Sequence, residues 1–216
     1  MSLLSLPRNI RDDIYRRVLA VAHPLYLFKD SGSTVVETFG PEIPRRWRAL
    51  LYTNRQVYDE ASAVLYGLNH FTLVDTTQKQ VVLLETFLNC IGSANAGLLS
   101  HLCINFPVAE GVDGKPGEVV LREDGLRSLK LLQDKCINLR TLEAFVHNEN
   151  SRGLTQASCD ESQFIQEALS GIDAHFKLIP SLSRIIVRFN SGSPASSVME
   201  LMKGLGWVIL VGDRGH

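Results

Sequence analysis

Three eight-residue stretches decide the fold: LSHLCINF at residues 99–106, LRTLEAFV at residues 139–146 and LSRIIVRF at residues 182–189. Each stretch has Leu or Ile at its first and fourth positions and then alternates variable and apolar residues. The second begins 40 residues after the first, and the third begins 43 residues after the second. Alternation at period two is typical of a β-strand. The sequence therefore predicts three strands that belong to repeated units.

Helical patterns separate the three stretches and follow the last one. Apolar residues recur there at intervals of three and four, which predicts a crossover helix after each strand. The pattern comprises Leu126, Leu129, Leu132 and Cys136, then Phe164, Ile165, Ala168, Leu169, Ile172 and Phe176, then Val198, Leu201, Met202 and Leu205. Residues 207–211 predict a final strand. Units of strand and helix build a parallel sheet, because each crossover returns the chain to the same edge.

The first part of the chain has a different pattern, which is mostly helical. Pro7 opens a helix in which Ile10, Ile14 and Val18 recur every four residues, with Arg11 among the charged residues on its other faces. Residues 24–44 are rich in turn formers and predict a loop that holds two short strands, at residues 25–28 and 34–36.

Two more helices and a strand are predicted before the repeated part. Pro44 opens a helix that carries Trp47, and another helix runs from residue 54 to residue 66, with Gly67 as its left-handed terminator. In this second helix Val57 and Ala61 face the core. Residues 71–74 predict a strand and residues 80–91 a further helix.

Composition limits the class of protein. The chain has 216 residues, of which 45% are hydrophobic and 21% charged, and a net charge of -1. These values predict a globular protein and disfavour nucleic acid as a partner, because general phosphate attraction needs net basic charge. The apolar runs are shorter than the roughly 18 residues of a membrane span, and no signal peptide is recognisable. We therefore expect no membrane association and a cytoplasmic or nuclear location.

The cysteines and catalytic motifs add little. The chain has 4 Cys, at positions 90, 103, 136 and 159, too widely spaced for a disulfide framework, and we expect buried thiols. The motifs of the serine hydrolases, of P-loop phosphate sites and of zinc helices are missing from the sequence. The sequence thus predicts no catalytic, cofactor-binding or metal-ligating residues.

Three weaker site hypotheses remain open. The loops at residues 107–118 and 148–162 follow predicted strands and could hold a small molecule or a catalytic site. Cys136 and His147 could form a nucleophilic pair if the fold brings them together. The basic cluster at residues 44–48, with Trp47 among three arginines, could contact a phosphate or a base.

A family resemblance covers roughly residues 4–150. It rests on LSLPRNIRDDIY at residues 4–15, LLYTNRQVYDEA at residues 50–61 and FLNCIGSAN at residues 87–95. Together these blocks resemble a group of filamentous-fungal F-box-like proteins. The sequence departs from the family pattern in two places. Asn9 stands where the family usually has Glu, and the loop at residues 24–44 interrupts the helices.

The resemblance implies a fold and a partner. An F-box is a short helical module that docks on the adaptor subunit of a cullin–RING ubiquitin ligase, while a C-terminal repeat domain holds the substrate. Leu6, Pro7, Ile10 and Ile14 would form the docking face. The alternative is that this N-terminal helix only caps the repeat domain.

We therefore expect an α/β protein in two parts. Residues 1–67 would form a small helical F-box-like region with an inserted loop. Residues 68–216 would form a leucine-rich-repeat-like parallel sheet flanked by helices, in units longer than the usual 20–29 or so residues. The expected function is a non-enzymatic protein-interaction module, with the ubiquitin-ligase substrate adaptor as its specific form. The alternative is a small-molecule-binding protein or enzyme with its site in the two loops.

Overall fold

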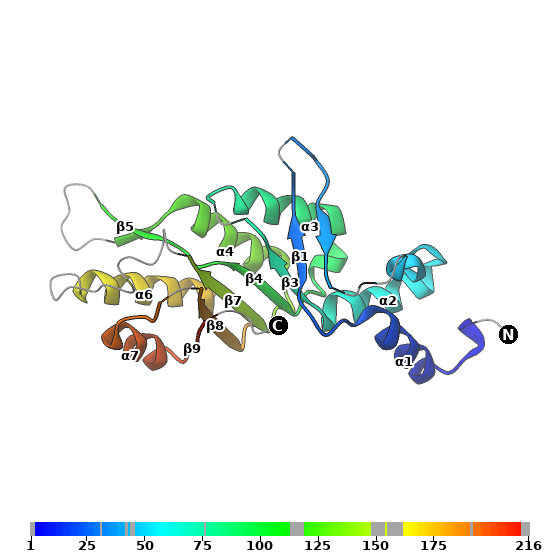
Figure 1. Ribbon diagram of the computed structural model, residues 1–216. Helices are drawn as coiled ribbons and strands as arrows, with labels where there is room; N and C mark the ends of the chain where they lie inside the picture. The colour runs from blue at the N-terminus through cyan, green and yellow to red at the C-terminus, as the bar shows by residue number, and fades with distance from the viewer. Residues whose placement is uncertain are drawn as a thin grey trace.

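The computed structural model describes residues 3–212 except 31, 42, 44, 45, 76, 113–118, 148–153, 155–161 and 191. It contains a seven-stranded sheet of order β2-β1-β3-β4-β7-β8-β9 and a two-stranded sheet, β5-β6. The pairing of β1 with β2 is antiparallel, and every other pairing in the large sheet is parallel. The expected α/β class with a mostly parallel sheet is thereby confirmed (Figure 1).

The strands are β1 (Leu25–Phe28), β2 (Glu37–Phe39), β3 (His70–Leu73), β4 (His101–Asn105), β5 (Ala109–Gly111), β6 (Val119–Leu121), β7 (Thr141–Val146), β8 (Arg184–Phe189) and β9 (Val208–Val211). The α-helices are α1 (Arg8–Leu19), α2 (Arg55–Leu68), α3 (Gln80–Ala96), α4 (Glu123–Lys135), α6 (Ser162–Lys177) and α7 (Ser196–Gly204). Two 3₁₀ helices, η1 (Leu3–Ser5) and η2 (Trp47–Tyr52), complete the N-terminal part.

The three repeated stretches form the centre of the sheet as β4, β7 and β8. From β3 to β9 each strand pairs with the next one in sequence, apart from the separate hairpin β5-β6, so the strand order never reverses. Crossovers of one hand then place all their helices on one face. The burial confirms this arrangement, because alternate strand residues and the apolar sides of α3, α4, α6 and α7 form one hydrophobic cluster. Its strand members include Phe71, Leu73, Leu102, Ile104, Leu142, Ala144, Val187 and Phe189.

The opposite side of the sheet is different in composition, and we call it the polar sheet face. It carries the side chains of His70, Thr72, His101, Cys103, Asn105, Thr141, Glu143, Phe145, Arg184, Ile186 and Arg188. None of these residues belongs to the hydrophobic cluster. Among the described residues, the helices that follow β3 to β8 thus pack against one face only.

The N-terminal helices form a second, smaller cluster beside the sheet. Tyr15 and Leu19 of α1 pack against α2 together with Leu50 and Leu51 of η2. Figure 1 shows α1 and α2 together beyond one end of the strands. The segment between α1 and η2 supplies β1 and β2, so residues within the first 67 also contribute to the sheet.

Several local predictions need correction. The second short strand is Glu37–Phe39, not residues 34–36. The helix carrying Trp47 is a 3₁₀ helix, and its expected opening residue, Pro44, lies outside the described residues. Gly67 does not terminate α2, which runs to Leu68 and ends at Asn69 in an extended conformation. The loop predicted at residues 107–118 contains β5, which pairs with β6 directly after the loop to form a hairpin.

Candidate functional site

A buried ion pair attaches α1 to α2. Glu60 is only 6% exposed, and its carboxylate accepts two hydrogen bonds from the guanidinium of Arg11, at 2.8 and 2.6 Å. The hydroxyl of Tyr15 donates to the same carboxylate at 3.0 Å, and the amide of Gln56 donates at 3.0 Å. Four donors thus converge on one buried carboxylate, which ties the two helices together.

The hydrogen bonds from Arg11 shift the titration of Glu60. They are the largest cause of a lowered pKa, about 2, for this carboxyl, and Gln56 and Tyr15 contribute in the same direction. The pKa of Arg11 is raised, mainly by its hydrogen bond to Glu60. Burial raises the pKa of Tyr15, so the phenol stays protonated and remains a donor.

A second polar contact fixes the end of α1. The amide nitrogen of the Asn69 side chain donates to the carbonyls of Leu19, at 2.9 Å, and Leu65, at 2.8 Å. Its oxygen accepts from the backbone N–H of Val21 at 2.8 Å. Asn69 therefore joins the last turns of α1 and α2, and the helix predicted from residue 54 to residue 66 is confirmed as α2.

The side chains of the predicted docking residues lie outside these attachments, although the backbone carbonyl of Leu6 accepts a hydrogen bond from Arg11 Nη1 at 2.6 Å. Ile10 is 44% exposed, Pro7 is exposed, and Leu6 and Ile14 are half-buried. None of the four belongs to the cluster that packs α1 on α2. We call Leu6, Pro7, Ile10 and Ile14 the N-terminal stripe.

The buried side of α1 is not the one that carries the apolar repeat. Arg11 was placed among the charged residues outside the apolar repeat, yet Arg11, Tyr15 and Leu19 are the buried residues of this helix. The physical reason is Glu60, whose buried carboxylate draws the guanidinium inward. A spacing rule that counts only apolar residues cannot detect such a pair.

Polar groups converge at the centre of the polar sheet face. Glu143 is 2% exposed, and one of its oxygens accepts a hydrogen bond from Arg188 Nε at 2.5 Å. Its other oxygen lies 3.7 Å from His70 Nε2 and 3.9 Å from His101 Nε2. The two imidazole rings stack with their centroids 3.7 Å apart. One carboxylate thus faces an arginine on one side and two histidines on the other.

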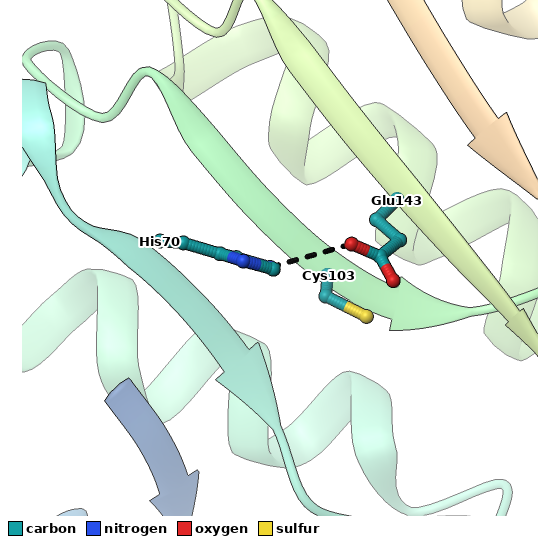
Figure 2. A group of neighbouring side chains, drawn as sticks. All are labelled: His70, Cys103 and Glu143. Carbon is teal, nitrogen blue, oxygen red and sulfur yellow. Dashed lines mark ion pairs between the residues drawn. The ribbon is translucent and has the colours of Figure 1, made fainter. Parts of the chain in front are cut away.

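Cys103 completes this cluster. It is 2% exposed on β4, between His70 on β3 and Glu143 on β7. One ligand atom from each of these three residues lies within 4.8 Å of the other two. Figure 2 shows the side chains of His70 and Glu143 extending toward each other across the strand that carries Cys103.

The sequence did predict the strands that carry Cys103 and Glu143, but not the cluster itself. Aligning the repeated stretches places Cys103 beside Glu143 and Phe145 beside Arg188, as the observed register does. That alignment of the variable positions was the available signal. The strand predicted at residues 71–74 began one residue after His70. The pairing of His70 with His101 could therefore not be inferred.

The proposed pair of Cys136 and His147 lacks support. Cys136 belongs to the hydrophobic cluster, and burial raises its pKa to about 12. His147 Nε2 instead lies 2.8 Å from the side-chain oxygen of Asn105. A thiol with so high a pKa is a poor nucleophile. The expectation of buried cysteines is wrong for Cys90, which is exposed, and Cys159 lies outside the described residues.

The two predicted ligand loops are only partly described, at residues 107–112, 154 and 162. A cavity of about 20 Å³ lies beside Pro107 and Val108, lined also by Asn105 and Arg122. Such a volume suits about one water molecule, whereas small-molecule sites occupy roughly 300–1,000 Å³. A larger cavity of about 520 Å³ is lined by Ser162, at the end of the second loop, together with Gln166 and Leu201. Its volume lies within that range, so the small-molecule alternative stays a prediction.

The basic cluster at residues 44–48 is also only partly described. Trp47 is half-buried and packs against both hydrophobic clusters, while Arg46 and Arg48 are exposed. Trp47 also lines a cavity of about 300 Å³ with Tyr66 and Phe87. A tryptophan held in packing is poorly placed to stack on a base.

No helix in the described part of the chain is long and apolar enough to cross a membrane. Comparison of the whole chain with protein-family models, with curated proteins and with solved structures finds no match.

Proposed function

We propose that this chain is a non-enzymatic protein-interaction module with two binding surfaces. The N-terminal stripe would dock on an adaptor subunit of a cullin–RING ubiquitin ligase, and the polar sheet face would hold a second protein. This is the arrangement of an F-box-like substrate adaptor with a leucine-rich-repeat-like domain. The observation that carries the proposal is that α1 is attached through one side while an apolar stripe occupies another.

The attachment of α1 supports a docking role over a capping role. Arg11, Tyr15 and Leu19 make the contacts with α2, so Ile10 and Ile14 are not needed to hold the helix in place. Exposed apolar side chains that recur on one side of a helix are typical of helix-in-groove recognition. The rigid attachment through Glu60 would keep this stripe ordered before a partner binds.

The sheet supports a second binding surface. Parallel sheets are normally covered on both faces, because crossover helices lie on each side. Here the strand order runs in one direction, and the described helices after β3 cover one face. Repeat proteins with this one-sided arrangement use the other face to bind partners. Arg184, which is exposed on this face, would offer charge and hydrogen bonds there.

The test is capture of the purified chain by the fungal ligase adaptor subunit. The informative variant carries Ile10→Asp and Ile14→Asp, which together change the net charge by -2. Arg16→Asp is the matched control, because it makes the same change of charge at an exposed position on another side of α1. We expect capture of the wild type and of the control, and loss of capture by the double variant.

Folding is monitored by far-ultraviolet circular dichroism for all three proteins. No capture of the wild type would contradict the docking proposal, as would equal capture of the folded double variant. Equal capture would mean that the chain binds the adaptor through another surface.

A further inference from the structure

We propose that His70, Cys103 and Glu143 form a zinc-binding site on the polar sheet face. One imidazole nitrogen, one sulfur and one carboxylate oxygen already lie within 4.8 Å of one another. These are the three donor types that Zn²⁺ takes from proteins. No sequence motif indicates a zinc ion at this position, and the proposed binding of protein partners does not require one.

The backbone places the three donors rigidly. They project from β3, β4 and β7, which are adjacent and hydrogen-bonded, with Cys103 paired directly to Glu143. Tetrahedral bonds of about 2.0–2.3 Å separate ligand atoms by roughly 3.5 Å. His70 Nε2 and Glu143 Oε2 are 3.7 Å apart, which matches that separation. All pairs of ligand atoms lie within 4.8 Å, so the atoms would have to approach one another by at most about 1 Å to share a metal.

The charges around the site suit a divalent cation. A Cys103 thiolate and the Glu143 carboxylate would together neutralise Zn²⁺. Arg188 binds the oxygen of Glu143 that does not face His70, which would orient the carboxylate toward the metal. Such hydrogen bonds to a ligating carboxylate are a regular feature of metal sites.

His101 offers a further nitrogen at the edge of the site. Its Nε2 lies 3.9 Å from the same oxygen of Glu143, and its ring stacks on that of His70. His101 or a water molecule could occupy the fourth position of a tetrahedron. Binding would convert the Cys103 thiol to a zinc thiolate and release its proton to the solvent, so affinity should rise with pH.

Zinc binding is measured by competition with a chromophoric chelator, on the full chain with no partner present. We expect one Zn²⁺ per chain at micromolar concentration. Cys103→Ser should weaken binding at least 100-fold, and His70→Gln at least 10-fold. Cys90→Ser is the matched control, because it makes the same change at an exposed cysteine and should leave binding unchanged.

Cobalt substitution identifies the ligand. We expect Co²⁺ to give a thiolate charge-transfer band in the near ultraviolet that persists in Cys90→Ser and disappears in Cys103→Ser. Circular dichroism confirms that each variant is folded. Failure of the wild type to bind micromolar Zn²⁺ would overturn the proposal, and so would equal binding by Cys103→Ser. Neither result depends on the ligase adaptor, so the two proposals fail independently.

Discussion

At the scale of single residues, a buried carboxylate determines how the first helix is oriented. Glu60 gathers donors from Arg11, Tyr15 and Gln56, and its pKa falls to about 2. Removing one partner of such a buried pair is strongly destabilising, because the other charge is left buried without compensation. The apolar repeat on α1 lies outside because the side of the helix that packs on α2 is the one that carries Arg11, Tyr15 and Leu19.

We expect Glu60→Gln to lower the free energy of unfolding at pH 7 by about 3 kcal/mol, because Arg11 would be left buried without its counter-charge. The folded pKa of Glu60 lies below its ordinary value, so its stabilising effect is present above about pH 5 and lost as pH falls toward 2. Urea unfolding at pH 7 and pH 3 should show the two proteins converging at the lower pH.

The control for this variant is Asp13→Asn, which removes an exposed ion pair with Arg17. Exposed pairs contribute about 0–1 kcal/mol, so this variant should change little at either pH. Equal losses in Glu60→Gln and Asp13→Asn would show that Glu60 does not hold α1.

At the scale of elements, the sequence predicts most clearly where a long-range pattern exists. The strands β4, β7 and β8 were located because apolar residues alternate and then recur after 40 and 43 residues. One error arose where a single polar side chain decides, because Gly67 yields to Asn69 as the end of α2. The strand β2 also lies further along than expected. The period and spacing of apolar residues indicate which residues are buried. A side-chain hydrogen bond such as that from Asn69 to Leu19 depends on residues distant in sequence.

The two asparagines that flank α2 allow this point to be tested. Asn54 caps the helix by accepting from the N–H of Val57 at 3.0 Å, and loss of such a cap costs about 1 kcal/mol. Asn69 is 1% exposed and makes three hydrogen bonds, two of them to the ends of different helices. Asn69→Ala should therefore cost about 3 kcal/mol, since buried backbone groups would lose their partners.

Urea denaturation of Asn54→Ala and Asn69→Ala, measured side by side, gives the comparison. A loss in Asn69→Ala no larger than that in Asn54→Ala would mean that Asn69 does not join the helices. In that case the hydrogen bonds to Glu60 would be the polar contacts that attach α1 to α2.

At the scale of the whole molecule, the direction of the strand order accounts for both the core and the polar sheet face. Because the order from β3 to β9 does not reverse, successive crossovers cover one face and a single hydrophobic cluster forms there. Neighbouring residues of one strand should then differ sharply in their contribution to the free energy of unfolding. On β7, Leu142 is fully buried in the cluster, whereas Thr141 is half-buried on the polar sheet face.

We expect Leu142→Ala to lower the free energy of unfolding by about 2–5 kcal/mol, because it leaves a cavity beneath the helices. Thr141→Ala, one residue away on the same strand, should lower it by less than about 1 kcal/mol, since no helix in the described part of the chain packs on that side. Both values come from urea unfolding at pH 7. Comparable losses would mean that the polar sheet face is packed as tightly as the core, and that its residues are held for stability rather than for binding.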